Sequence, residues 1–369
     1  MSATEPALLL TGATGLVGGE LLPSLLAARP DRRLVVLARR PESLLSWSDD
    51  PRVRVLAGDL GAPHLGLDAA QAAELRRTLT EIIHCAAGTR FDLPIEEARE
   101  VNVGGTAKVL ELARACRRLE KFAHVSTVYV AGRLSGLIPE ALLRRRGGFC
   151  NSYQQSKREA EELVAGAMGE IPAAIFRLSS IIGDSATGRV RQFNHVHQLL
   201  KLFPQNVLPV APGAPGASID MVPTDWAVGA LAHLYEQGFA PGRVYQICAG
   251  PQGSLKVREM MAITQELFET HPAGRRWLPI RVPKLVSLPE YERWADKSRR
   301  AGDRLLNELL RVLGLFLPHL GIRQAFDNQL ALAGLAGSGL VLPPVAQTYR
   351  KVVAYCLETD WGRRLSPSP

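Results

Sequence analysis

The sequence predicts an α/β fold, a doubly wound parallel sheet followed by a smaller, mostly helical C-terminal cap. Short apolar runs alternate with helical patterns through the first half, which is typical of a parallel sheet covered on both faces. One such run, residues 8–10, leads into a glycine-rich turn that opens a helix. After Pro251 the patterns are mostly helical and are punctuated by Pro and Gly. With 369 residues, 46% of them hydrophobic, the chain can bury a sizeable core.

Each element of the sheet is expected from a buried apolar run or from the helical pattern that follows it. The strands are predicted at residues 7–10, 34–38, 53–56, 82–86, 122–126 and 173–178. The helices between them are predicted at residues 18–28, 74–79, 102–118 and 153–168. A sheet of this kind binds ligands beyond the carboxyl ends of its strands, where the winding reverses.

The pattern loosens from about residue 183. The remaining elements are predicted as a loop at 208–217, an extended segment at 220–223, a strand at 244–247, and helices at 225–235, 255–270, 291–317 (in pieces) and 344–356. Two regions are therefore predicted. Residues 1–250 form the sheet domain, with some loops from 183–220 contributing to the cap, and residues 251–369 form the helical region.

The glycine-rich turn has the pattern of a dinucleotide site. Its glycines occupy positions one, four and seven of a G-x-x-G-x-x-G frame, which permits a tight turn and a close approach to a pyrophosphate. The helix that begins there directs free N–H groups at the anion. A turn without a ligand is the alternative, but the strand before it and the strand–helix repeats after it favour a ligand. The predicted cofactor-binding residues here are Thr11, Gly12, Thr14, Gly15, Leu16, Val17 and Gly18.

Two arginines after the second predicted strand bear on the choice of cofactor. An NAD-specific site usually has an acid there, whereas this chain has Arg39 and Arg40, whose guanidinium groups suit a 2′-phosphate. NADPH is therefore predicted over NADH, with Arg39 the better candidate; the alternative is that both are surface residues of a loop. Asp59, after the third strand, is expected either to bond the adenine amino group or to cap a helix. Residues 1–250 are thus predicted to be a Rossmann-type NADP-binding domain.

A tyrosine and a lysine four residues apart supply the candidate proton-transfer chemistry. Ser152 and Gln155 resemble a capping box, which predicts Tyr153 in the first turn of a helix and Lys157 one turn further on the same face. A nearby ammonium is expected to lower the pKa of the phenol, which then donates a proton to a developing alkoxide. Lys157 is also expected to hold the ribose of the nicotinamide. An exposed helical pair without function is the alternative.

A hydroxyl at the end of the fifth predicted strand completes the set. Thr127 is expected to bond the substrate carbonyl oxygen and to stabilise negative charge there. Its neighbour Ser126 should point to the opposite face, because side chains alternate along a strand. His195 and His197 are two apart without a third ligand nearby, so no metal site is predicted. His84 and His124 are expected to be core or edge residues.

Several motifs together resemble the extended short-chain dehydrogenase/reductases, most closely the fatty acyl-CoA reductase and thioester reductase branch. The matching segments are TGATGLVGGELL (11–22), GDL (58–60), IIHCAAGTRFD (82–92), VNVGGTAKVLELA (101–113), HVSTVYVAG (124–132), YQQSKREAE (153–161), FRLSSIIGDSATG (176–188) and DMVPTDWAVGAL (220–231). The resemblance implies that Thr127, Tyr153 and Lys157 are a catalytic triad and that NADPH is the donor. It also implies that Leu60, Ala86 and Ala87 lie at the cofactor.

The resemblance has departures. Arg158 stands where the branch often has an aromatic residue, and the region after Pro251 matches only loosely, so the acyl chain and its carrier are left open. The reaction implied is NADPH-dependent reduction of an acyl thioester, bound to coenzyme A or an acyl carrier protein, to the aldehyde and in some members to the alcohol. The apolar residues 305–320 are expected to be core, or else the wall of an acyl tunnel.

Two other functions are kept as alternatives. The first is an NAD(P)-dependent dehydrogenase or epimerase of a sterol-like, secondary-alcohol or nucleotide-sugar substrate. Among these substrates, the apolar C-terminal region suits a lipid better than a sugar diphosphate. The second is a non-catalytic NADP-sensing protein, although such proteins usually lack part of the triad. A homodimer through the helices at 102–118 and 153–168 and a monomer are both compatible with the sequence.

Composition bounds the compartment and the partners. The net charge of +8 is mostly due to dispersed arginines, which decorate a surface or attract an anionic partner such as coenzyme A or a carrier protein. No nucleic acid partner is predicted. The five cysteines lie far apart, which fits a reducing cytoplasmic location rather than a disulfide framework. No run of about 18 uncharged apolar residues is present, so no integral membrane segment is expected.

Overall fold

Seven parallel strands form the central sheet of the protein, whose structure here is a computed structural model describing residues 5–145, 147–213, 216–277, 279–302 and 304–364. The strand order is β12-β7-β5-β4-β1-β2-β3. The strands are β1 (Ala7–Thr11), β2 (Leu34–Ala38), β3 (Val53–Ala57), β4 (Leu79–His84), β5 (Lys121–Thr127), β7 (Ala173–Leu178) and β12 (Val244–Ile247). Because β1 pairs with β2 on one side and with β4 on the other, the winding reverses at β1. A crevice for a ligand is therefore expected at its carboxyl end.

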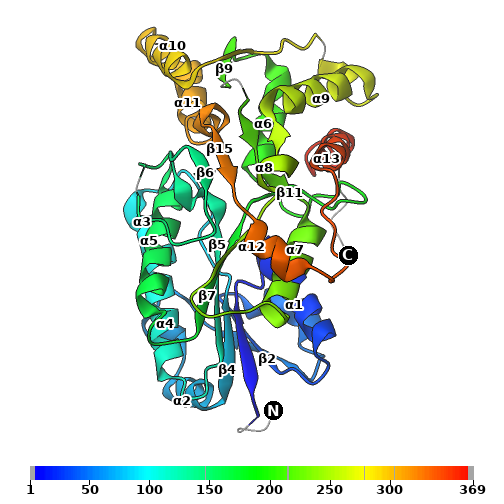
Figure 1. The fold of residues 1–369 in the computed structure, drawn as a ribbon. Coiled ribbons are helices and arrows are strands. Elements are labelled where there is room, and N and C mark those ends of the chain that lie inside the picture. The colour runs from blue at the N-terminus through cyan, green and yellow to red at the C-terminus, as the bar shows by residue number, and fades with distance from the viewer. Residues whose placement is uncertain (1–4, 146, 214–215, 278, 303, 365–369) are drawn as a thin grey trace.

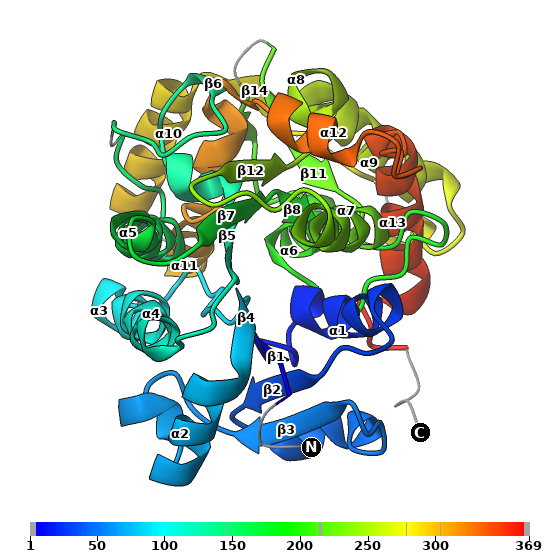
Figure 2. The same ribbon diagram turned by 60° about the horizontal axis from the view of Figure 1, so that its bottom comes forward.

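Helices cover both faces of this sheet, as Figure 2 shows. On one face lie α2 (Ala69–Thr78), α4 (Gly105–Ala115) and α5 (Ser152–Ala167); on the other lie α1 (Leu16–Ala28) and α7 (Thr224–Glu236). Apart from the edge strand β3, the strands are almost entirely buried, because helical layers cover both faces of the sheet. The predicted doubly wound parallel sheet is confirmed.

The cap lies over the carboxyl ends of the strands, at the top of Figure 1. Its helices are α6 (His195–Leu202), α9 (Val257–Thr270), α10 (Leu288–Arg300) and α11 (Arg304–Leu313). The last helices, α12 (Gln329–Leu335) and α13 (Val345–Thr359), return to pack against α7 and α9 respectively. One apolar core runs from the sheet into the cap and includes Leu8 and Leu310.

Short strand pairs attach the cap to the sheet domain. β15 (Gln324–Phe326) runs parallel to β6 (Gly136–Ile138), and β14 (Lys284–Val286) runs parallel to β9 (Val210–Pro212). The second pair corrects the loop predicted at 208–217, of which residues 214–215 lie outside the described residues. Residues 210–212 form a strand despite the neighbouring prolines, because β14 of the cap supplies the backbone hydrogen bonds.

Other predicted boundaries also need correction. In place of one helix at 102–118, the chain forms α3 (Ile95–Arg99), a π-helical turn at Glu100–Gly104, and α4. α2 begins earlier than predicted because the Asp68 side chain caps it in a capping box with Gln71. β4 consequently begins at residue 79 rather than 82. α9 begins at Val257, because residues 255–256 pair with β10 (Ser218–Ile219). α6 was not predicted.

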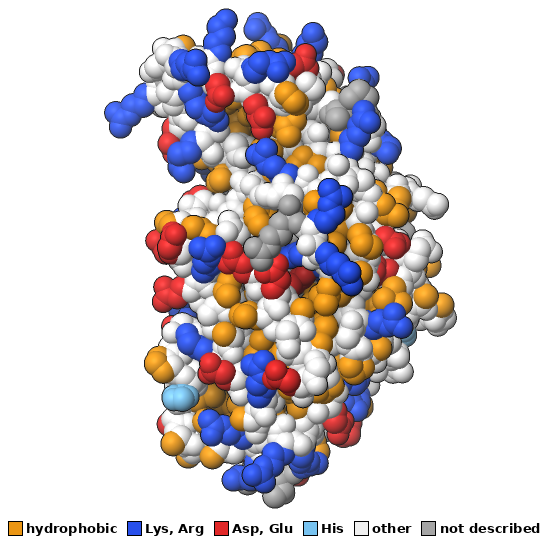
Figure 3. Space-filling view, turned by 60° about the vertical axis from the view of Figure 1, so that its left-hand side comes forward, with side chains coloured by type: hydrophobic (Ala, Val, Ile, Leu, Met, Phe, Trp, Pro, Cys, Tyr) orange, Lys and Arg blue, Asp and Glu red, His pale blue; other side chains and the backbone are white. Residues whose placement is uncertain are grey.

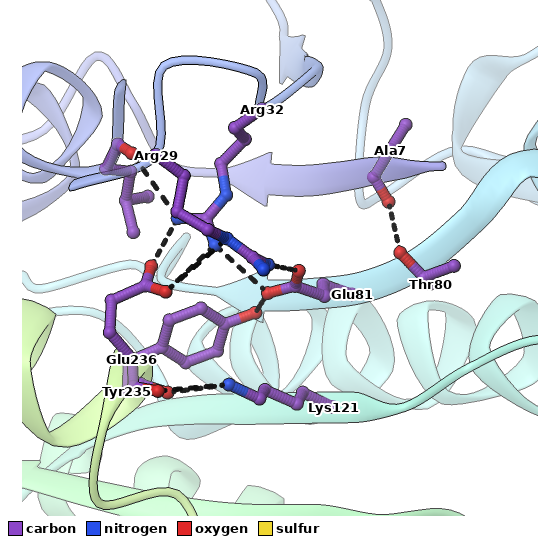
Figure 4. Close-up of polar contacts among 9 residues, drawn as sticks. Ala7, Arg29, Arg32, Thr80, Glu81, Lys121, Tyr235 and Glu236 are labelled. Atoms are coloured by element: carbon purple, nitrogen blue, oxygen red, sulfur yellow. Dashed lines mark hydrogen bonds and ion pairs between the residues drawn. The ribbon is translucent and has the colours of Figure 1, made fainter. Parts of the chain in front are cut away.

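A buried cluster of ion pairs connects several elements at the amino-terminal end of the strands β4 and β5 (Figure 4). The Arg32 guanidinium pairs with Glu236 and Glu81, and all three side chains are more than nine-tenths buried. The Tyr235 hydroxyl donates to Glu81, and the Lys121 ammonium donates to the Tyr235 carbonyl oxygen at 3.1 Å. These contacts join α7 to the starts of β4 and β5, far from the ligand edge.

Candidate active site

A cavity of about 870 Å³ occupies the ligand edge of the sheet. Every site residue predicted from the sequence lines it, except Arg40. These lining residues are Thr11, Gly12, Thr14, Gly15, Leu16, Val17, Gly18, Arg39, Asp59, Leu60, Ala86, Ala87, Thr127, Tyr153 and Lys157. The structure therefore places the candidate nucleotide turn and the candidate catalytic side chains in one continuous space.

The glycine turn has no room for a Cβ atom at Gly12 or at Gly18. Gly12 has a φ of +82°, and a Cβ atom there would lie 2.6 Å from the backbone nitrogen of Ala86. A Cβ atom on Gly18 would lie 2.3 Å from the carbonyl oxygen of Gly12. No side chain caps the start of α1, where Gly15 is the N-cap. A bare turn facing an uncapped helix end fits the pyrophosphate of a dinucleotide.

The residues at the ends of β2 and β3 take different positions. The exposed Arg39 lines the cavity. Arg40 does not; its carbonyl oxygen instead accepts hydrogen bonds from Ser43 and starts a short helical turn. The Asp59 carboxylate lines the cavity and accepts a hydrogen bond from Gly61 N at 2.9 Å. It does not cap α2, whose N-cap is Asp68, and its expected bond to the adenine amino group stays a prediction.

Tyr153 and Lys157 lie in the first turns of α5. The N-cap is Asn151, whose side chain accepts from Gln154 N at 3.0 Å, rather than the predicted Ser152. The shift of one residue leaves Tyr153 in the first turn, as predicted. The Lys157 ammonium is 3% exposed and donates to the carbonyl oxygen of Val125 at 2.9 Å. This bond joins α5 to β5 below the cavity.

The pKa values in this pair differ from the sequence-based expectation. Burial raises the pKa of Tyr153 to about 12, although a hydrogen bond with Thr127 acts to lower it. Burial also lowers the pKa of Lys157 to about 8, against the attraction of Glu161. The expected lowering of the phenol's pKa by Lys157 is therefore wrong for this structure. The cause is desolvation, which disfavours the charged form of each group.

Thr127 meets Tyr153 as predicted, since the two hydroxyl side chains are hydrogen-bonded. The Thr127 oxygen also accepts a hydrogen bond from Tyr129 N at 3.2 Å, which fixes its rotamer. Ser126 lines the cavity as well, and its buried hydroxyl has no partner among the described residues. The prediction that Ser126 would point away from the site is therefore wrong, because Ser126 and Thr127 both line the cavity.

A buried polar network supports the floor of the cavity. His84 lies between two hydroxyls, with Nδ1 2.9 Å from Thr11 Oγ1 and Nε2 3.0 Å from Thr106 Oγ1. Asn102, in the π-helical turn, accepts from Gly88 N at 2.7 Å and donates to Ser156 Oγ at 2.9 Å. The π-helical turn directs Asn102 at the loop after β4, and such turns are frequent at functional sites.

An aromatic cluster covers Tyr153 on the cap side. Phe91 stacks on Tyr153 with ring centroids 5.3 Å apart, His195 stacks on Phe91 at 5.0 Å, and Phe316 packs against Phe91 in a tilted arrangement at 5.2 Å. His195 Nε2 lies 3.2 Å from Ser180 Oγ. The sequence analysis did not select Phe91, His195 or Phe316 for the site, because they come from three distant segments. Phe91 does lie within one of the resembling motifs.

Arg158 also has a structural role in this chain. It is buried, and it donates to Glu162 at 3.0 Å and to the carbonyl oxygen of Leu143. It therefore anchors the loop before α5. Among the described residues, no group of three His, Cys, Asp or Glu side chains is placed to hold a metal ion. In the same part of the chain, no helix is both long and apolar enough to cross a membrane.

Known proteins resemble this chain in sequence and in structure. A model of the NAD-binding family described as male sterility protein matches residues 10–231. The chain is 34% identical over 228 residues to an isonitrile lipopeptide synthase of Streptomyces coeruleorubidus, covering 56% of this chain and 15% of that protein. It is 26% identical over 360 residues to fatty acyl-CoA reductase 1 of Gallus gallus, covering 83% of this chain and 70% of that protein.

A solved structure matches almost the whole chain. It is the terminal R domain from the myxalamid PKS-NRPS biosynthetic pathway, with a TM-score of 0.75 and 27% identity, covering 98% of this chain and 92% of that one. By contrast, the chain spans a third or less of the first curated synthetases that it matches. The family match and the bare glycine turn identify the cavity as a site for a nicotinamide cofactor.

Proposed function

The chain belongs to the NAD-binding family described as male sterility protein, and from this premise we propose that it reduces an acyl thioester with NADPH. The observation that carries the proposal is the meeting of Thr127, Tyr153 and Lys157 in the cavity that the glycine turn also lines. The names of its relatives support the substrate class, since they include a fatty acyl-CoA reductase and the reductase domain of a thiolation-reductase pair.

In this reaction, different residues of the chain would bind the cofactor, donate the proton and stabilise the carbonyl oxygen. The turn at residues 11–18 would hold the pyrophosphate, and Lys157 would hold the ribose next to the nicotinamide. When bound, NADPH supplies a hydride to the carbonyl carbon. Tyr153, a neutral phenol at physiological pH because of its raised pKa, donates a hydrogen bond and then a proton to the carbonyl oxygen. Thr127 steadies the same oxygen.

Collapse of the resulting hemithioacetal completes the reaction. The C–S bond breaks, the thiolate leaves with a proton, and Tyr153 recovers its proton from the hydroxyl as the aldehyde forms. One thioester, one NADPH and one proton are thus converted to one aldehyde, one thiol and NADP⁺. The aromatic cluster of Phe91, His195 and Phe316 keeps water away from the carbonyl, because its rings cover Tyr153 on the cap side.

Arg39 is proposed to select NADPH over NADH. It is the exposed guanidinium that lines the cavity after β2, where a 2′-phosphate is expected. We expect Arg39→Ala to weaken NADPH binding by roughly tenfold or more while NADH binding is unchanged, measured by nicotinamide fluorescence. Arg40→Ala is the matched control, because it removes the same charge outside the cavity. Equal losses for both cofactors in Arg39→Ala would contradict this role.

The charge of the cap supports a carrier-bound, anionic substrate. Residues 271–323 contain eleven Lys and Arg against five Asp and Glu, which is most of the chain's net charge of +8. Lys and Arg gather along the top of the molecule in Figure 3, over the cap. This concentration differs from the dispersed charge expected from the sequence. Such a surface attracts a phosphopantetheine phosphate and an acidic carrier protein.

The experiment that tests the function is a substrate panel. The protein is incubated with NADPH and the same acyl group on pantetheine, on coenzyme A and on an acyl carrier protein, and loss of nicotinamide absorbance is followed. We expect oxidation of NADPH with at least one thioester, fastest with the carrier that the cap recognises. Turnover of secondary alcohols or nucleotide sugars, with none of any thioester, would contradict the proposal.

A further inference from the structure

The Lys157 ammonium has a second acceptor besides the backbone. Its Nζ lies 2.9 Å from Val125 O and 3.3 Å from Nε2 of His124, which comes from the middle of β5. Lys157 also lines the cavity. Two of its three N–H groups are therefore directed at β5, which leaves the third for a ligand.

His124 is fully buried and lacks a partner on its other side. Its exposed fraction is 0%, and Nδ1 has no hydrogen-bond partner among the described residues. Burial and the neighbouring Lys157 hold the pKa of His124 well below its ordinary value, so the ring is neutral. A neutral ring that faces an ammonium with Nε2 must carry its proton on Nδ1. A buried N–H group without an acceptor lowers the stability of the fold. A residue that served only for packing would therefore be expected to have an apolar side chain at this position.

We propose that His124 is a positioning residue, whose Nε2 accepts a hydrogen bond from Lys157 and thereby keeps that ammonium protonated and fixed beside the cofactor. The inference rests on the proposed role of Lys157 in holding the ribose. It goes further in assigning a role to a side chain that has no direct access to the substrate. His124 acts only through Lys157.

The other titratable groups around Lys157 leave this role to His124. From β4, His84 is neutral because burial lowers its pKa to about 3, and its two nitrogens already face hydroxyls. Directly after β4, burial raises the pKa of Cys85 to about 11, so it is a neutral thiol. From α5, the Glu161 carboxylate attracts the Lys157 ammonium, but its oxygens are bound by the buried Arg177 of β7 at 2.8 Å, so that attraction does not fix where the ammonium lies. Tyr153 is an uncharged phenol.

The test measures the titration of Lys157 directly, without a substrate. The chain has eight lysines, so the protein is labelled with [¹³C]lysine and the Lys157 signal is identified by its absence in Lys157→Arg. In wild type we expect a midpoint near the pKa of about 8. In His124→Leu and His124→Asn we expect it to fall by about one pH unit, because the acceptor is lost or too short to reach. His124→Gln places an amide oxygen near the position of Nε2 and keeps the wild-type midpoint.

Asn and Gln form the decisive pair, because both are polar and they differ in reach. Phe122→Leu is the control for packing, since residues 122 and 124 share a face of β5 and Phe122 makes no polar contact with Lys157. We expect the alkaline limb of kcat/KM to move to lower pH by the same amount in His124→Asn. Equal Lys157 midpoints in wild type, His124→Asn and His124→Leu would overturn the proposal. Because the titration needs no thioester, this result is distinct from a failure of the reductase function.

Discussion

Tyr153 is prepared as a donor of a proton rather than as a phenolate. Its pKa is raised to about 12 by desolvation of the partly buried ring, on which Phe91 stacks, and the hydrogen bond with Thr127 only partly offsets this effect. A neutral phenol suits reduction, in which negative charge develops on the substrate oxygen and needs a donor. In the proposed mechanism Lys157 binds and orients the ribose, and its lowered pKa reflects the same desolvation.

Removing this one hydroxyl tests the assignment at the residue scale. We expect Tyr153→Phe to lower kcat by roughly 100-fold or more, because Thr127 would still offer the carbonyl oxygen a hydrogen bond but would not replace the phenol as the source of the proton. Binding of NADPH, followed by fluorescence, should be unchanged, since the phenyl ring still packs on Phe91. Tyr291→Phe, a buried tyrosine of α10, is the matched control and should retain activity. Full activity in Tyr153→Phe would remove the phenol from the mechanism.

At the scale of the element, the turn before α1 is the most constrained part of the site. Its geometry depends on Gly12 and Gly18, which lie close to backbone atoms of Ala86 and of Gly12, respectively. A Cβ atom on either glycine would come closer to those atoms than Cβ atoms do in real structures. The element is thus shaped for close approach of the backbone to a ligand.

A single methyl group should disrupt this element. We expect Gly18→Ala to abolish measurable NADPH binding, because its Cβ atom would lie 2.3 Å from the carbonyl oxygen of Gly12 and would push the turn apart. Gly166→Ala is the control, since a Cβ atom there meets nothing within 4 Å and α5 should gain up to about 1 kcal/mol of stability. Isothermal titration calorimetry measures binding for both. Wild-type affinity in Gly18→Ala would show that the turn does not contact the cofactor.

The sequence was most informative where a local pattern decides the element. The strands at 34–38, 173–178 and 244–247 lie where they were predicted, because uninterrupted apolar runs are buried on both faces. The N-cap of α5 was misplaced by one residue, since asparagine and serine both cap well. β9 and α6 were missed because their partners are remote in sequence. His195, Phe91 and Phe316 were missed for the same reason.

At the scale of the whole molecule, the family expected from the sequence is confirmed. The extended short-chain dehydrogenase/reductase pattern of the thioester-reducing branch agrees with the family match over residues 10–231 and with the solved R domain. The apolar residues expected at 305–320 are mostly core, with Leu310, Leu313 and Leu317 buried, while Phe316 lines the cavity. The side chain of Leu305 lies outside the described residues. The division at residue 250 and the homodimer stay predictions.

Stability should depend on the ion-pair cluster at the far end of the sheet. We expect Arg32→Leu to lower the free energy of unfolding by about 3–5 kcal/mol, because it removes the buried guanidinium and leaves the buried Glu81 and Glu236 with only the half-exposed Arg29 as a partner. Arg29→Ala, whose side chain is 48% exposed, should cost at most about 1 kcal/mol. Urea unfolding measures both. A loss in Arg32→Leu no larger than that in Arg29→Ala would contradict the structural role of this cluster.

Four buried or partly buried histidines should make the protein sensitive to acid. Burial lowers the pKa of His84 and His195 to about 3 and that of His197 and His319 to about 4. The unfolded chain binds protons at these rings near pH 6.5 and the folded chain does not, so stability is present above pH 6.5 and is lost as pH falls toward 4. Each ring costs about 1.4 kcal/mol per pH unit in that window. Urea midpoints that stay constant between pH 7 and 4.5 would contradict these burial effects.

The central claim is that one cavity brings a hydride donor and a thioester carbonyl against Tyr153. It is tested most directly with NADPH deuterated at the transferable C4 position and an acyl-pantetheine thioester, with the products analysed by mass spectrometry. The account predicts an aldehyde that carries one deuterium at its former carbonyl carbon and one equivalent of free thiol per NADPH oxidised. Thiol released without deuterium in the product would instead show hydrolysis, and would contradict the account.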